Sequence, residues 1–253
     1  MRFSRAIVRL PAESFAQGLT RAALGPADLA RMRAQHAAYV DALRAAGLEV
    51  QQLDAAPQYP DAHFVEDVAV VTPELAVIAR PGAAPRRGEE LLMEPVLAAH
   101  RLLARIQEPG TLEGGDVLPI GKRCFIGVTA RTNEAGARQL ETILAAHGYR
   151  CVLIPVAHTL HLKSDLNAVS DESVVVTPAL AGHAALADYE KIVVQPDEAY
   201  AANVLRVNDR LLMPHGFPRL RDKLHAAGVA VLELDMSEAR KMDGGLTCLS
   251  LRF

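Results

Sequence analysis

The chain has 253 residues, of which 50% are hydrophobic, and it carries a formal net charge of −3. This balance is typical of a globular protein with a sizeable core. It provides neither a basic face for nucleic acid nor a polybasic run for a membrane surface, so we expect no partner of either kind.

The first ten residues interrupt their apolar run with arginines, which does not match a secretory signal and predicts a cytoplasmic protein. The cysteines, Cys124, Cys151 and Cys248, form no CxxC pair and have no metal-ligand spacing with histidine. They therefore predict free thiols in a reducing compartment, with no disulfide framework and no structural metal.

A helix-to-strand pattern recurs along the chain. Each clear copy ends a helix with two alanines, stops it with a left-handed glycine and runs into a strand. A recurrence of this length predicts a supersecondary unit repeated about five times. The clear copies are 42–50, 143–151 and 223–231, and the weaker ones are 88–100 and 179–188.

Pairs of strands with polar turns separate these helices, so each unit reads β-β-α-β. The last pair is divided between 2–10 and 246–253, and pairing of these halves would close a ring. We predict a single α/β domain over 1–253 with its functional loops at the centre. An open α/β sheet in chain order is the alternative. The other strand pairs are 65–71 with 75–79, 116–120 with 124–128, and 203–207 with 211–213.

The irregular stretch 11–26 is small, glycine-bearing and mildly apolar. It is either a lid or a surface connection, and the sequence alone favours the connection.

An acidic cluster stands at the entrance to an apolar strand. Asp61, Glu66 and Asp67 lie within seven residues, and strand alternation would place Glu66 and Asp67 on opposite faces. Such clusters are usually solvated turns. Because the following strand reads as buried on both faces, these carboxylates need a partner, and a cationic ligand would serve.

Two arginines stand at the beginnings of predicted helices. Arg86 precedes one and Arg131 precedes the other, where Thr132 or Asn133 is a plausible cap. Arginine opposes the macrodipole at a helix N-terminus. Binding of a carboxylate by the guanidinium fork would explain both positions, and ordinary surface arginines are the alternative.

Glycine pairs accompany two residues that could carry chemistry. Glu113 is followed by Gly114 and Gly115, and Cys248 follows Gly244 and Gly245 one residue into an expected strand. Glycines there allow a tight turn and close approach to a ligand. A buried, unreactive cysteine is the alternative for Cys248.

His161 lies between two leucines, where a structural histidine is common. The fivefold repeat, however, places Glu66, Glu113, His161 and Cys248 at comparable strand entries of different units. We expect these side chains to converge on one centre.

In order and spacing, these motifs closely resemble the dimethylarginine dimethylaminohydrolase (dimethylargininase) family of the guanidino-modifying, or pentein, superfamily. The resemblance extends over essentially the whole chain. It implies an α/β propeller of five β-β-α-β units. The motifs are Glu66-Asp67, Arg86, Leu112-Glu113-Gly114-Gly115-Asp116, Ala130-Arg131-Thr132-Asn133, His161-Leu162-Lys163 and Asp243-Gly244-Gly245-Leu246-Thr247-Cys248.

The resemblance also implies residue roles. Cys248 would be the nucleophile, and His161 the general acid and base. The guanidinium nitrogens would be bound by Glu113, which the family counts as catalytic, with Asp67 and Glu66. The substrate carboxylate would be held by Arg86 and Arg131, and the amino-acid end by Asp61 with main-chain groups of Leu19 and Met242. No metal or cofactor is implied. The expected partner is a methylated arginine, and a homodimer is possible.

The chemistry agrees with these roles. A guanidinium carbon is a poor electrophile, so fixed carboxylates must hold the cation close to a thiolate. The departing nitrogen needs a general acid. The predicted reaction is hydrolysis of dimethylated or monomethylated arginine to citrulline through a covalent thiouronium.

Rival hypotheses remain. Arginine deiminases share the motif logic but carry an extra helical insertion for which this chain has no room, and agmatine has no carboxylate for Arg86 and Arg131. A silent binding protein would not need Cys248, His161 and Glu113 together. A metal-binding protein using Cys248 and His161 would have few ligands, so zinc would be adventitious and inhibitory.

Overall fold

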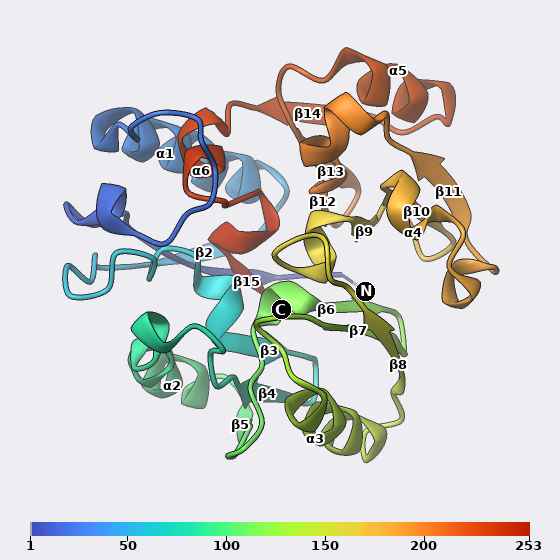
Figure 1. The fold of residues 1–253 in the computed structure, drawn as a ribbon. Helices are drawn as coiled ribbons and strands as arrows, with labels where there is room; N and C mark the ends of the chain where they lie inside the picture. Colours follow the sequence, from blue (N-terminus) through green and yellow to red (C-terminus); the bar gives the residue numbers. More distant parts are fainter. Residues whose placement is uncertain (1) are drawn as a thin grey trace.

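Five three-stranded sheets are arranged around a common centre in the computed structural model, which describes residues 2–253 (Figure 1). In every sheet the middle strand pairs antiparallel with one neighbour and parallel with the other. A helical crossover connects each parallel pair, as in any β-α-β unit. The predicted α/β propeller of five β-β-α-β units is therefore confirmed.

The elements follow the repeat. The strands are β1 (Arg5–Arg9), β2 (Glu49–Leu53), β3 (Ala69–Val71), β4 (Leu75–Ile78), β5 (Leu102–Arg105), β6 (Val117–Ile120), β7 (Arg123–Val128), β8 (Arg150–Pro155), β9 (Leu166–Ala168), β10 (Ser173–Val176), β11 (Glu190–Val193), β12 (Leu205–Val207), β13 (Arg210–Pro214), β14 (Val231–Leu234) and β15 (Leu251–Arg252). The helices are α1 (Leu29–Ala45), α2 (Glu89–Ala98), α3 (Glu134–Ala145), α4 (Pro178–Ala181), α5 (Pro218–Ala226) and α6 (Ser237–Lys241).

The two ends of the chain share one sheet. β1 pairs antiparallel with β15, with Ala6 opposite Arg252 and Ile7 opposite Leu251. The Ser4 amide also donates to the Phe253 carbonyl at 2.9 Å. The N and C labels accordingly lie near each other at the middle of the ring (Figure 1). The predicted closure by the terminal strands is confirmed.

The glycines after α1, α3 and α5 adopt the left-handed conformation that the repeat predicts. Gly47, Gly148 and Gly228 have φ values of 88°, 80° and 75°. The helix expected over 179–188 is instead divided into α4 and a 3₁₀ turn at Ala184–Leu186, with Gly182 at the C-cap of α4. The sequence prediction missed this break because the apolar spacing continues across it.

The innermost strands β3, β6, β9, β12 and β15 surround a central cavity of about 140 Å³. The helices cover the outer parts of the sheets. Leu140 and Leu144 of α3, for example, pack with Cys124 and Ile126 of β7 in one hydrophobic cluster. Packing of this kind fixes the inner ends of the strands, where the site lies. Within residues 2–253, no helix is long and apolar enough to span a bilayer.

Candidate active site

Glu66, Asp67 and Cys248 lie on 3₁₀ turns immediately before innermost strands, and Glu113 and His161 directly precede such turns. The sequence pattern placed Glu66, Asp67 and Cys248 inside strands, and this was wrong. A 3₁₀ turn directs successive side chains differently from a strand, so Glu66 and Asp67 do not alternate across a sheet. The turns are Val65–Val68 before β3, Gly114–Asp116 before β6, Leu162–Ser164 before β9 and Thr247–Leu249 before β15.

The paired glycines let these turns approach one another. A Cβ at Gly114 would collide with the Glu66 carbonyl, and one at Gly115 with the His161 ring. On the other side, Gly244 leaves no room beside the Phe64 ring. The glycine pairs therefore allow the close approach that the sequence predicted.

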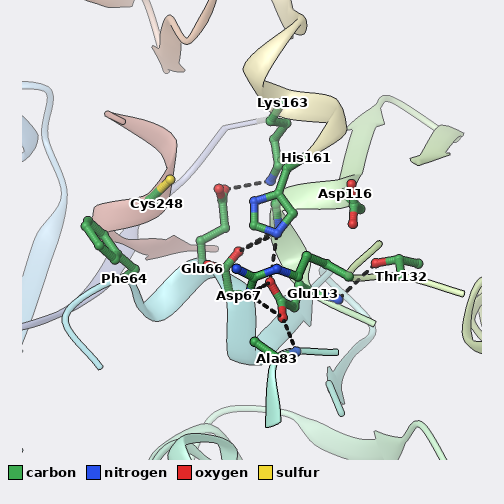
Figure 2. A network of polar contacts seen from close by, with 12 residues as sticks. Phe64, Glu66, Asp67, Ala83, Glu113, Asp116, Thr132, His161, Lys163 and Cys248 are labelled. Carbon is green, nitrogen blue, oxygen red and sulfur yellow. Dashed lines mark hydrogen bonds and ion pairs between the residues drawn. The ribbon is translucent and has the colours of Figure 1, made fainter. Parts of the chain in front are cut away.

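His161 is buried among carboxylates (Figure 2). Its Nε2 lies 2.8 Å from Glu113 Oε2 and 4.0 Å from Asp67 Oδ1. Burial by itself lowers the pKa of His161, but the charges of Asp67, Asp116 and Glu113 outweigh burial and raise it to about 9. His161 is therefore an imidazolium at neutral pH, able to donate a proton.

Glu113 is fully buried, and its carboxylate contacts an imidazole, a guanidinium and a backbone amide. Burial raises the pKa of Glu113, but the hydrogen bond and charge of His161 lower it well below its usual value, with help from Arg86 and Arg131. Its Oε1 also accepts from the Ala83 amide at 3.1 Å. The Thr132 hydroxyl accepts from the Glu113 amide at 3.1 Å and fixes the backbone. Glu113 therefore stays ionised.

Cys248 faces the same space as His161 and Glu66 (Figure 2). Its Sγ accepts from the Gly245 amide at 3.4 Å. Burial and the negative charges of Glu66 and Asp67 raise the pKa of the thiol to about 12. Cys248 is therefore a neutral thiol until a positive charge enters the site.

Glu66 has cationic partners within the chain. Its Oε1 accepts from Lys163 Nζ at 2.6 Å and from Arg252 Nη2 at 3.2 Å. Its Oε2 has no hydrogen-bond partner among the described residues. The expected need for a cationic partner is thus met in part by Lys163 and Arg252, while the second oxygen remains free to accept.

Both arginines reach the site, where they pair with its carboxylates. Arg86 Nη1 lies 2.5 Å from Asp67 Oδ2, and Arg86 Nη2 lies 2.7 Å from Glu89 Oε2. Arg131 Nη1 lies 3.3 Å from Glu113 Oε1. As predicted, both positions precede helices, and Asn133 caps α3 by accepting from the Gly136 amide.

The stretch 11–26 covers one side of the site instead of merely connecting two elements. The Leu19 amide donates to Asp61 Oδ2 at 3.0 Å, and burial raises the pKa of that carboxyl. The Arg21 amide donates to Asp243 Oδ2 at 2.6 Å. This stretch is therefore anchored on both walls of the site.

Two cavities meet at Cys248 and His161. The smaller, about 20 Å³, is lined by Leu19, Asp61, Arg86, Arg131 and Met242 beside them. The larger, about 210 Å³, is lined by residues that include Thr159 and Tyr200. Nine of the ten predicted site residues thus line one or both of these cavities, and the tenth, Glu113, contacts His161 in their wall.

Comparison with known proteins agrees with this arrangement. A family model described as arginine deiminase matches residues 56–209. N(G),N(G)-dimethylarginine dimethylaminohydrolase from Pseudomonas aeruginosa is 40% identical over 253 residues, covering 99% of this chain and all of the relative. The chain belongs to the dimethylarginine dimethylaminohydrolase family.

Solved dimethylarginine dimethylaminohydrolase structures share the whole fold. A cysteine-to-serine variant of the Pseudomonas aeruginosa enzyme with citrulline matches with a TM-score of 0.98 and 38% identity, covering 100% of both chains. A histidine-to-glycine variant, captured as an adduct with S-methyl-L-thiocitrulline, matches with a TM-score of 0.97 and 39% identity, covering 99% of this chain and 100% of that one.

Other residues support this dimethylarginine dimethylaminohydrolase site without having been predicted. Asn203 Nδ2 donates to the Lys163 carbonyl at 3.0 Å and to Thr247 Oγ1 at 3.1 Å, while its Oδ1 accepts from the Thr247 amide at 3.1 Å. Asn203 thus joins the turn of Cys248 to the turn that follows His161. The sequence could not predict this role, because Asn203 is an isolated asparagine between apolar residues. Lys163, by contrast, belongs to the recognised motif His161-Leu162-Lys163.

Proposed function

We propose that this chain hydrolyses Nω,Nω-dimethyl-L-arginine, and Nω-monomethyl-L-arginine, to L-citrulline and the corresponding methylated amine through a covalent thiouronium on Cys248. One observation carries the proposal: Cys248, His161, Glu66 and Asp67 line two adjoining cavities, Glu113 contacts His161, and one Glu66 oxygen lacks a hydrogen-bond partner among the described residues. The family's activity supports it.

The guanidinium would bind between the carboxylates of Glu113 and Asp67, with the free oxygen of Glu66 nearby. These groups hold the planar cation so that its central carbon faces the sulfur, which replaces a chance encounter by a fixed geometry. The cation also offsets the negative charges that raise the pKa of Cys248. Substrate binding therefore favours release of the Cys248 proton to solvent, and the resulting thiolate attacks the bound cation.

The reaction would proceed in two halves. Sulfur attacks the guanidinium carbon, and the His161 imidazolium protonates the methylated nitrogen as the carbon–nitrogen bond breaks. The neutral His161 then accepts a proton from water, and the hydroxide attacks the thiouronium. The carbon–sulfur bond breaks and frees the thiolate, which regains a proton as the added hydroxyl gives one up, and the ureido group of citrulline forms.

Arg131 would exchange partners when substrate binds. Its guanidinium pairs with Glu113, the group proposed to hold the guanidinium of the substrate. A substrate with both a carboxylate and a guanidinium satisfies both residues if Arg131 takes the carboxylate and Glu113 the cation. Asp61 and the main chain of Leu19 and Met242 would hold the amino-acid end in the smaller cavity, with Arg86 beside it.

The larger cavity supports methylated over unmodified arginine. It is lined by Cys248 and His161 but not by Arg131, so it can receive the departing amine with its methyl groups. An arginine deiminase needs no such space for ammonia. This contrast favours the dimethylarginine assignment within the same chemistry.

A parallel assay tests the proposal. Dimethylated, monomethylated and unmodified arginine would be incubated with the wild type and with Cys248→Ser, and citrulline and amines would be measured. We expect citrulline with dimethylamine from the wild type and none from the variant. Equal turnover of unmodified arginine with release of ammonia would assign the chain to the deiminases instead.

The same proposal extends to location and domain extent. Cys248 must remain reduced, which favours the cytoplasm. The neighbours of Cys248 come from four different units of the ring, which favours a single functional unit over 1–253.

A homodimer is compatible with the exposed Leu91 and Leu102, which are 61% and 80% accessible. Light scattering after gel filtration tests it, since a monomeric mass would refute the dimer.

A further inference from the structure

Two cysteines outside the reaction centre lie directly opposite each other. Cys124 of β7 and Cys151 of β8 are register partners in a parallel strand pair. Partners on neighbouring strands project from the same face of a sheet. Both contribute to the hydrophobic cluster under α3, which shows that this face is the one covered by the helix.

The spacing of the pair fits a disulfide. Neighbouring strands lie about 4.8 Å apart, and disulfides join residues whose Cα atoms are about 4.4–6.8 Å apart. The two side chains already share one face, so the bond requires only side-chain rotation and small adjustment. Both cysteines are free thiols in the structure.

The two thiols differ in access. Cys124 is on the central strand of its sheet and fully buried, whereas Cys151 is on the edge strand and only half-buried. A small oxidant can therefore reach Cys151, while Cys124 is buried on the neighbouring strand. This is the arrangement of an attacking thiol with a neighbouring resolving thiol.

The electrostatics agree with this division. The proximity of the two thiols lowers the pKa of Cys151, and the same proximity together with burial raises the pKa of Cys124. Of the two sulfurs, the accessible one therefore forms the reactive thiolate more readily. Cys248, whose pKa is raised to about 12, is the poorer thiolate in the substrate-free protein.

We propose that Cys124 and Cys151 form an oxidative modification site that hydroperoxides convert to an intrachain disulfide. The Cys151 sulfur attacks the peroxide oxygen, the O–O bond breaks, and one oxygen remains on sulfur as a sulfenic acid while the other leaves as water or alcohol. Cys124 then attacks the Cys151 sulfur, and the oxygen of the sulfenic acid leaves as water. The peroxide is reduced and the dithiol is oxidised by two electrons.

This site is independent of the proposed hydrolysis. It lies at the beginnings of β7 and β8, while the far ends of these strands lead to Arg131 and His161. The bond would tie two strands that already pair along their length, so the ring should remain intact. We expect the pair to take up the first oxidising equivalents while Cys248 stays reduced.

The printed sequence makes the test direct. Arg123 and Arg150 precede the two cysteines, so trypsin releases peptides 124–131 and 151–163, and Cys248 appears in peptide 242–252. Full-length protein would be treated with a small excess of hydrogen peroxide, alkylated and digested without reductant. We expect the first two peptides linked, the link lost on reduction, and Cys248 alkylated.

Serine variants supply the control. Cys124→Ser should leave Cys151 to collect oxygen without forming a link, and Cys151→Ser should prevent rapid oxidation of Cys124; both should retain turnover, with circular dichroism confirming folding. Cys124→Ala replaces Cys124→Ser if the serine is not tolerated in the core. Oxidation of Cys248 before the pair, a link to Cys248, or alkylation of both cysteines after peroxide would overturn the proposal.

Discussion

Two buried histidines of this protein have opposite proton affinities. His161 is surrounded by carboxylates, and its pKa is raised to about 9. His63 lies between the rings of Phe15 and Phe64, with centroids 5.1 and 3.9 Å away. Burial, with the nearby charges of His36 and Arg86, lowers its pKa to about 3. Similar burial thus gives opposite results, and the neighbours decide which form of imidazole the protein keeps.

The difference implies opposite contributions to stability. Taking about 6.5 for an unfolded histidine, the native state binds the extra proton at His161 between about 6.5 and 9. Its stabilisation is therefore complete below that range and is lost as pH rises through 9. At His63 the unfolded state binds more protons between about 3 and 6.5, so stability falls as pH drops through that range.

The largest expected effect comes from removing His161. His161→Gln keeps a polar side chain but removes the proton donor, and general acid–base catalysis is worth about 10²–10⁴-fold in rate. We expect kcat for citrulline formation to fall by that factor. His63→Gln is the matched control and should stay within about twofold of the wild type. Equal losses in the two variants would show that burial, and not chemistry, underlies the role of His161.

Glu113→Gln should have the next largest effect. It removes the negative charge next to His161 Nε2 and replaces the charge-assisted hydrogen bond by, at most, a weaker one to an amide oxygen. A hydrogen bond to a charged group is worth about 1.5–3 kcal/mol, so we expect kcat/KM to fall by at least about tenfold. The pKa of His161, followed by NMR of its ring protons, should also fall. An unchanged His161 pKa would contradict the role of Glu113.

Asp116→Asn should have a smaller effect of the same sign. Asp116 raises the pKa of His161 by its charge, while its Oδ1 accepts from the Leu162 amide at 2.9 Å. Asparagine can keep that hydrogen bond, so the fold of the turn should survive. We expect the same NMR titration to show a lower His161 pKa, with a smaller shift than in Glu113→Gln. A larger shift would reverse the ranking of these two carboxyls.

The smallest effect on turnover is expected from His63→Leu. Both ring nitrogens of His63 lack hydrogen-bond partners among the described residues. Leucine has no nitrogen to protonate, so the destabilisation below pH 6.5 should diminish. Circular dichroism during acid titration should show unfolding at a lower pH than in the wild type. An unchanged midpoint would mean that His63 is not a source of acid sensitivity.

The sequence predicted the ring because a helix ending in two alanines and a glycine recurs with regular spacing. It could not distinguish a strand from a 3₁₀ turn followed by a short strand at Val65–Val68 and Thr247–Leu249, since both contain brief apolar runs. The site residues were recognisable from their motifs. Asn203 and Arg252 were not, because each acts on groups distant in sequence.

The pairing of the arginines shows the same limit. Arg86 and Arg131 were expected to await an external carboxylate, yet each pairs with an acidic residue of its own protein. Sequence shows which charges are present but not how they pair when folding brings them together. For Arg86 one partner, Glu89, is three residues away in the sequence, while the other, Asp67, belongs to the 3₁₀ turn before β3.

β15 follows all the other strands along the chain, so its pairing with β1 cannot form until those strands have been synthesised. The ribosome releases Glu66, Glu113 and His161 well before Cys248, and the thiol enters its position only when β15 docks beside β1. A nascent chain that stops before the turn of Cys248 would contain Glu66, Glu113 and His161 but not the sulfur. The position of the proposed nucleophile therefore depends on contact between two strands that are far apart in the sequence.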